Sequence, residues 1–247
     1  MEAKEEEFIV TQEWLEKLRT SEDEIMEFEK YFPNGGITID VLNKFMSIDN
    51  LRFIEWILSM TPSFPFAKGT NASYLIDELA QYKRYYTVIQ LLDKLPFNET
   101  PLVVDNVNNY LFYDGDVYVK GNVNPQRIYV KGNLKIDGKL TVKDRQVDEL
   151  RAQQISASEI NLFNHAKIYA QIKAKIVNLK VCSMISGNVE ADTVKLNHSL
   201  ILSNVDANEI INDGGYIWGD VNTIKIQNLN GGRVAGKITY KRSDEHK

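Results

Sequence analysis

Apolar and polar positions follow two different periods along the chain. From residue 11 to about residue 95 the apolar residues recur every three to four positions, which predicts amphipathic helices. Beyond a segment with two prolines at 96–101, they alternate with polar residues in runs of three to six, which predicts short strands. The predicted organisation is a helical module at 1–96, a linker or first-rung cap at 97–104, a β domain at 105–240 and a charged tail at 241–247.

Helix caps can be placed in the first half. Thr11 precedes an apolar stripe, and Ser21 with Glu24 has the spacing of a capping box, in which the hydroxyl accepts a hydrogen bond from a free backbone amide. Asp49 is expected to begin a further helix, and Ser73 is expected to cap another. The aromatic residues of these apolar stripes are expected to form a packed helical core, with a peptide or cofactor groove as the alternative.

A phrase of about seventeen residues recurs five times in the second half. Its first positions are separated by 17, 17, 16 and 16 residues, and apolar or small residues follow at +2, +5 and +7. A fixed period of this size indicates rungs that stack on one another, about 4.8 Å apart, with backbone hydrogen bonds between them. Glycine and asparagine or aspartate at the corners are expected to supply positive φ angles. The first positions are Ile155, Ile172, Val189, Val205 and Val221.

The segment at 185–196, with Gly187 and Ala191 at fixed places, resembles a rung of the bactofilins, and the segment at 217–226 is a shortened version of it. Bactofilins are right-handed β-solenoids that polymerise end to end without nucleotide. The resemblance covers roughly residues 105–240. It implies that the β domain is a right-handed parallel β-helix, and stepping through the repeat gives about eight rungs. The predicted fold is therefore α+β by segment, with the helical module followed by this β-helix. The preceding module and the charged tail depart from that family and disfavour open filaments, whereas a dimer through one end is feasible.

The helical module has a resemblance of its own. Trp14, the segment at 28–35 and Trp56 are similar to a small helical module of phage- and prophage-encoded proteins. That resemblance implies a viral origin and no particular reaction.

Composition and charge narrow the class of protein. The 247 residues have a net charge of -5, with Lys and Arg scattered through the repeats, which disfavours a nucleic-acid binder. Cys182 is the single cysteine, so no internal disulfide can form, and its place inside a repeat predicts a buried thiol. The acidic start and the lack of a long apolar run predict a cytoplasmic protein without a membrane segment.

Two classes of enzyme use β-solenoids. Hexapeptide acyltransferases place an apolar residue every six positions, a spacing that does not fit this repeat. Pectin- and glycoside-cleaving β-helices need paired carboxylates in a groove. Five acidic residues fall near equivalent corners here, and we interpret them as a solvated edge, with a sugar- or cation-binding strip as the alternative. They are Glu159, Glu190, Asp192, Asp206 and Glu209.

Other chemical motifs are not found in the sequence. His165, His198 and His246 lack the spacing of metal ligands, and the glycine pairs lack the context of a phosphate-binding loop. The sequence therefore predicts no catalytic residue, no cofactor, no metal site and no enzymatic activity.

Aromatic residues beside glycine are the candidates for binding a partner protein, because they are expected to point outward from the rungs. A tight corner covered by an aromatic ring is the alternative for the pair near residue 217. The candidates are Tyr216 and Trp218 near one end of the rod, and Tyr113, Tyr118 and Tyr129 near the other.

These expectations together predict a non-enzymatic interaction or scaffold protein that is encoded by a phage and binds a protein partner through the solenoid faces. A phage inhibitor of a host protein, such as a defence factor, is a sharper form of this hypothesis. A bactofilin-like polymer and a carbohydrate-active or acyl-transfer enzyme are the alternatives. We expect a homodimer or small homo-oligomer in the cytoplasm, of the host cell if the chain is phage-encoded.

Overall fold

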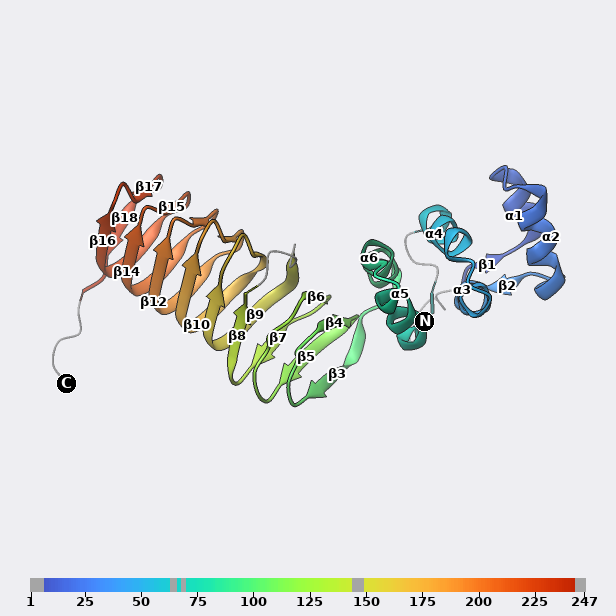
Figure 1. Cartoon of the computed structure of the whole chain (residues 1–247), viewed down its shortest axis with the longest axis horizontal. Coiled ribbons are helices and arrows are strands. Elements are labelled where there is room, and N and C mark those ends of the chain that lie inside the picture. The colour runs from blue at the N-terminus through green and yellow to red at the C-terminus, as the bar shows by residue number, and fades with distance from the viewer. Residues whose placement is uncertain (1–6, 63–65, 68–69, 144–148, 243–247) are drawn as a thin grey trace, which may run out of the picture. The chain divides into compact units, whose positions relative to one another are not determined.

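The computed structural model describes residues 7–62, 66–67, 70–143 and 149–242 (Figure 1). The chain divides into two compact units, Met1–Asn98 and Glu99–Lys247. The first unit is helical and the second is a parallel β-solenoid of about eight turns, as the periods predict.

The described residues of the helical unit form six helices and a pair of short strands that sequence reasoning missed. Strands β1 and β2 pair antiparallel, and the glycine-rich segment after the second helix supplies β2. The elements are β1 (Ile9–Val10), α1 (Gln12–Lys17), α2 (Glu22–Tyr31), β2 (Gly36–Ile37), α3 (Thr38–Ser47), α4 (Leu51–Met60), α5 (Ser73–Gln81) and α6 (Tyr85–Lys94).

Two of the four predicted caps are confirmed. The Thr11 hydroxyl accepts from the Trp14 amide, and the Ser21 hydroxyl accepts from the Glu24 amide. The prediction for Asp49 is wrong, since this residue takes a φ of 59° in the turn before α4 and leaves the cap to its neighbour, Asn50.

The prediction for Ser73 is also wrong in detail. Ser73 is the first residue of α5, and Ala72 occupies the cap position without a side-chain bond. The Asn71 side chain accepts hydrogen bonds from both the amide and the hydroxyl of Ser73, at 3.0 and 2.6 Å. Asn71, two positions earlier, thus accepts a hydrogen bond from a free backbone amide at the start of the helix, which is the role expected of Ser73.

Aromatic rings fill the core of the helical unit, as the apolar stripes predict. Phe28, Phe45 and Phe53 are fully buried, and the rings of Phe45 and Phe53 lie 4.1 Å apart between centroids. Trp56 stacks on Phe53 at 5.9 Å. Packing of this kind is worth several kcal/mol for each ring, so these residues hold the unit together.

The solenoid consists of three ladders of strands, whose rungs lie side by side in Figure 1. The first ladder contains β4 (Tyr110–Tyr113), β6 (Arg127–Val130), the starts of β9 (Leu150–Leu162) and β10 (Lys167–Lys180), β11 (Met184–Ile185), β13 (Leu200–Ile201), β15 (Tyr216–Ile217) and β17 (Arg233–Val234). The second contains β3 (Asn98–Val104), β5 (Gly115–Val119), β7 (Leu134–Ile136), later parts of β9 and β10, the starts of β12 (Val189–Asn197), β14 (Val205–Asp213) and β16 (Val221–Leu229), and β18 (Ile238–Tyr240). The third contains β8 (Lys139–Val142) and the ends of the long strands.

The register confirms the repeat. All five first positions of the phrase pair in one column, and the side chains from Ile155 to Val221 are buried there. The small residues at +2, from Ala157 to Ala207, stack in a second column. The repeat is blurred from Lys143 to Arg151, and residues 144–148 of this segment lie outside the described residues.

Glycine has a different role from the one predicted. Gly187 and Gly219 do not take a positive φ; instead a Cβ on Gly187 would lie 1.8 Å from the Ala170 carbonyl oxygen of the preceding rung. Left-handed φ angles occur in another set of turns, after the third ladder, and mostly at residues other than glycine. They occur at Asn164, His165, Val181, Cys182, His198, Gly214, Asn230 and Gly231.

Candidate functional site

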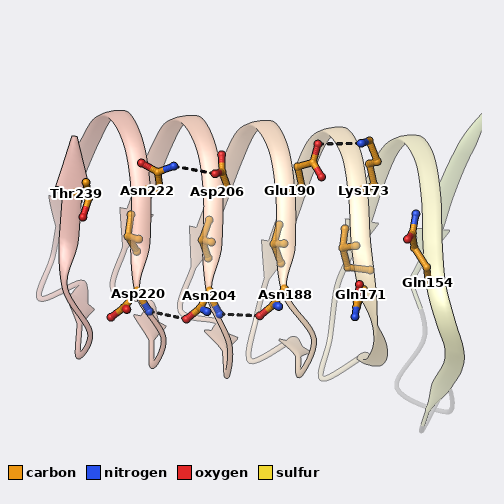
Figure 2. A pocket seen from close by; sticks show the side chains of 14 residues that line it. Gln154, Gln171, Lys173, Asn188, Glu190, Asn204, Asp206, Asp220, Asn222 and Thr239 are labelled. Carbon is orange, nitrogen blue, oxygen red and sulfur yellow. Dashed lines mark hydrogen bonds and ion pairs between the residues drawn. The ribbon is translucent and has the colours of Figure 1, made fainter. Parts of the chain in front are cut away.

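The solenoid has a polar groove of about 790 Å³ along its second ladder (Figure 2). In each rung an inward apolar residue forms the floor, and the residues before and after it form the two walls. Along one wall, the side-chain oxygen of Asn188 accepts a hydrogen bond from the backbone amide of Asn204 at 3.2 Å. The side-chain oxygen of Asn204 in turn accepts one from the backbone amide of Asp220 at 2.8 Å. These walls bring carboxylate, amide and amine groups together at the spacing of the rungs.

The charged groups of the other wall are bonded to one another. Lys173 and Glu190 form an ion pair at 2.9 Å. Asp206 accepts from Asn222 and from Lys241, and the bond from Lys241 is the main cause that lowers the pKa of Asp206. Polar groups that satisfy one another between rungs tie the rungs together, and both carboxylates of this wall, Glu190 and Asp206, have partners of this kind.

The five acidic residues of the predicted edge lie in three columns, and each lies beside an amine or amide of a neighbouring rung. The columns hold Glu190 with Asp206, Glu159 with Glu209, and Asp192 by itself. Glu159 pairs with Lys139, Asp192 accepts from Asn208, and Glu209 pairs with Lys225. This pattern favours the solvated edge over a sugar- or cation-binding strip.

One of these pairs makes stability depend on pH. Lys139 lies 2.6 Å from Glu159, and its hydrogen bond lowers the pKa of Glu159. Because the folded pKa lies below the unfolded one, the stabilisation is complete above the ordinary pKa of glutamate and is lost as pH falls through the folded pKa. Lys139→Met is therefore expected to cost about 0.5 kcal/mol near neutral pH.

Chemical denaturation of wild type and Lys139→Met at a series of pH values tests this. The difference in unfolding free energy should shrink to zero in acid. A difference that stayed constant down to low pH would assign the cost to lost packing of the lysine stem instead.

The first ladder presents a different surface, which we call the aromatic face. It consists of the outward side chains of that ladder, in two columns that register relates rung by rung. One column contains Tyr110, Arg127, Lys167, Met184, Leu200, Tyr216 and Arg233. The other contains Phe112, Tyr129, Arg151, Tyr169, Leu202 and Trp218.

Rings and aliphatic side chains gather most densely where the face approaches its C-terminal end. Trp218 and Leu202 are exposed, at 58% and 41%, and the rings of Tyr216 and Trp218 lie 5.4 Å apart. Ile217 between them is fully buried, as the alternation predicts. Two large apolar side chains open to solvent on adjacent rungs form a patch of the kind that protein interfaces use.

The other half of the face is more basic. The guanidinium of Arg151 lies 5.5 Å from the centre of the Tyr169 ring, and its bond to Glu149 raises the pKa of Arg151. The rings of Tyr110 and Phe112 stack at 5.9 Å. Arginine between aromatic rings adds cation–π attraction to the apolar contact that this surface can offer.

The structure brings together three of the five predicted aromatic residues. Tyr129, Tyr216 and Trp218 lie on the aromatic face. Tyr118 points outward from the second ladder, where its hydroxyl donates to Asp137 and this bond raises the pKa of Tyr118.

The outward position predicted for Tyr113 is wrong. Its partner in register is the buried Val130, and its ring packs against the core while its hydroxyl donates to the Thr100 carbonyl at 2.6 Å. Burial is the main cause that raises the pKa of Tyr113. Sequence reasoning also missed five residues that flank a buried apolar residue of the first ladder, although this alternation would have identified the face. They are Tyr110, Phe112, Tyr169, Leu200 and Leu202.

Cys182 is exposed, so the prediction of a buried thiol is wrong. The residue lies in the turn between β10 and β11 with a φ of 58°, where the chain leaves the third ladder and the side chain points away from the core. His165 and His198 occupy equivalent turns, and their amide and carbonyl groups bond to the turn that holds Cys182. Within the described ranges no three His, Cys, Asp or Glu residues gather to hold a metal ion.

Comparison with protein-family models, with curated proteins and with solved structures gave no match. None of the helices that the structure describes is long and apolar enough to cross a membrane.

Proposed function

We propose that this chain is a non-enzymatic interaction protein whose aromatic face binds a partner protein. The observation that supports the proposal best is the exposure of Trp218 and Leu202 beside Tyr216 on adjacent rungs. Tryptophan and tyrosine are enriched among the residues that dominate binding energy, since their rings bury a large area at little entropic cost. A stacked sheet also keeps these rings in fixed positions before the partner arrives.

The charges of the face indicate the chemistry of that partner. Arg127, Lys167 and Arg233 lie in one column, and Arg151 lies in the other. The acidic neighbour among the described outward positions, Glu149, is already bonded to Arg151 at 2.9 Å. We therefore expect a partner surface with an apolar centre and acidic groups around it, because opposite charges at a rim favour association.

A cross-linking experiment tests this proposal. A photoreactive phenylalanine analogue in place of Trp218 should form an adduct with one protein in cells that produce the chain, and the same analogue at Lys175, exposed between the second and third ladders, should not. With that partner purified, Trp218→Ala should weaken binding about thirtyfold while the thermal unfolding midpoint stays within a few degrees.

Adducts at both positions, or none at Trp218, would contradict the proposal. So would unchanged affinity of the Trp218→Ala variant for the cross-linked partner. In either case the exposed ring of Trp218 would only pack over a tight turn of the solenoid and would not bind a partner.

The resemblance of the helical module to phage proteins makes a host protein, such as a defence factor, a candidate for this partner. A bactofilin-like polymer is a second candidate function, favoured by the final rung of the solenoid, on which no further strand stacks within the described chain. Sedimentation, described in the next subsection, distinguishes these functions, because a polymer self-associates and a protein that only binds a host factor does not.

A further inference from the structure

The C-terminal end of the solenoid leaves strands without a neighbour. Strands β17 and β18 are the last of their ladders, and the second half of β16 pairs with β14 on one side and with no described strand on the other. Figure 1 shows these three strands together at the end of the rod. Open strand edges can pair with another polypeptide, and folded proteins usually cover or disrupt them.

Apolar side chains are partly open at this end. Ile226, Val234 and Ile238 continue the inward columns but are only half buried. Leu229 and Tyr240 are exposed at 46% and 64%. An added strand would bury the three inward residues, because their equivalents on the preceding rung are buried.

The final rung is also uniformly basic. Residues 221–242 contain five basic side chains and no acidic one. Lys225 and Lys241 reach back to Glu209 and Asp206 of earlier rungs. Arg233, Lys237 and Arg242 are exposed and have no carboxylate partner among the described residues. A positive potential at an open edge attracts negatively charged chains.

A polar column ends at the same place. Leu162, Leu179 and Leu196 form an inward column of the third ladder, and the next two rungs have Asn212 and Asn228 there. The Asn212 amide donates to the Asn228 side-chain oxygen at 2.9 Å. The Asn228 amide nitrogen is thereby left as a donor at the end of the column, suited to a carboxylate or carbonyl oxygen.

We propose that this end of the solenoid binds an acidic, extended segment of a partner protein, which adds as a strand to the final rung. Backbone pairing with the open edge would supply affinity, and the three unpaired basic residues would select acidic side chains. This surface shares Arg233 with the aromatic face but none of its rings, and the inference does not depend on the function proposed for that face.

A second copy of the chain fits this end less well. Two such ends meeting face to face would bring two sets of five basic side chains together, and like charges on adjacent strands are destabilising. An acidic segment removes that repulsion and replaces it with ion pairs.

The test uses the full chain and two labelled peptides, one of alternating glutamate and valine and one of alternating lysine and valine. Fluorescence anisotropy at low ionic strength should show binding of the acidic peptide alone, weakened by added salt. Replacing Arg233, Lys237 and Arg242 by glutamine should weaken binding about tenfold. The matched control replaces Lys143, Lys175 and Lys195, which are exposed on earlier rungs, and should bind as wild type.

Circular dichroism of both triple variants shows whether each is folded, and Trp218→Ala should leave peptide binding unchanged, which separates this surface from the aromatic face. Four results would overturn the inference: no binding of the acidic peptide, equal binding of both peptides, an equal loss in the control variant, or concentration-dependent self-association in sedimentation that the end variant abolishes. The last result would assign this end to a second copy.

Discussion

Gly187→Ala is expected to lower the unfolding free energy of the solenoid by about 3 kcal/mol. The new methyl carbon would lie 1.8 Å from the Ala170 carbonyl oxygen and 2.4 Å from its carbon. Both atoms belong to the backbone of the rung below, so no side-chain rotation relieves the overlap. The two rungs must separate locally, which weakens the hydrogen bonds between them. Urea unfolding followed by far-UV circular dichroism measures the loss.

Gly231→Ala is the matched control. Gly231 has a φ of 81°, but no atom lies within 4 Å of the position of its added Cβ. The control should therefore cost about 1 kcal/mol, from backbone conformation alone. If the control cost more than Gly187→Ala, then the corners would require glycine for its φ angle, as the sequence first suggested, and the close approach of rungs would be unimportant.

The fold could be predicted from the sequence because its dominant constraint is repetitive. An inward residue such as Val189 must stack on Ile172 below and Val205 above, so the spacing of the phrase reports the size of a coil directly. The turns gave no such signal. Cys182 and His198 adopt left-handed φ angles that side-chain type does not predict, because hydrogen bonds between successive turns impose them.

The candidate site was harder to predict for a different reason. Outward residues experience no stacking constraint, so Tyr129 and Trp218 had to be assigned to a face without the register of the strands. That register shows that strands of two residues, such as β13 and β15, align Leu202 with Trp218. Tyr113 was grouped with Tyr118 and Tyr129 as outward, but its alignment with Val130 makes it an inward residue.

Phe53→Ala is expected to destabilise the helical unit by about 4 kcal/mol. Its ring is fully buried between Phe45 and Trp56, and removal leaves a cavity in the centre of that core. A loss of this size is a large part of the stability of a unit this small. In a Trp218→Phe background the remaining tryptophans, Trp14 and Trp56, both report on the helical unit, so fluorescence follows its unfolding alone.

Tyr86→Ala is the control, because this ring on α6 is 74% exposed and its removal should change stability by less than about 0.5 kcal/mol.

The same variants test which unit recognises partners. The solenoid has its own apolar core, made of residues from Leu102 onward, so its strands should persist when the helices unfold. Binding of the acidic peptide that survives Phe53→Ala would show that the last rung acts without the helical unit. Binding lost together with the helical signal would show instead that the helices contribute to that surface.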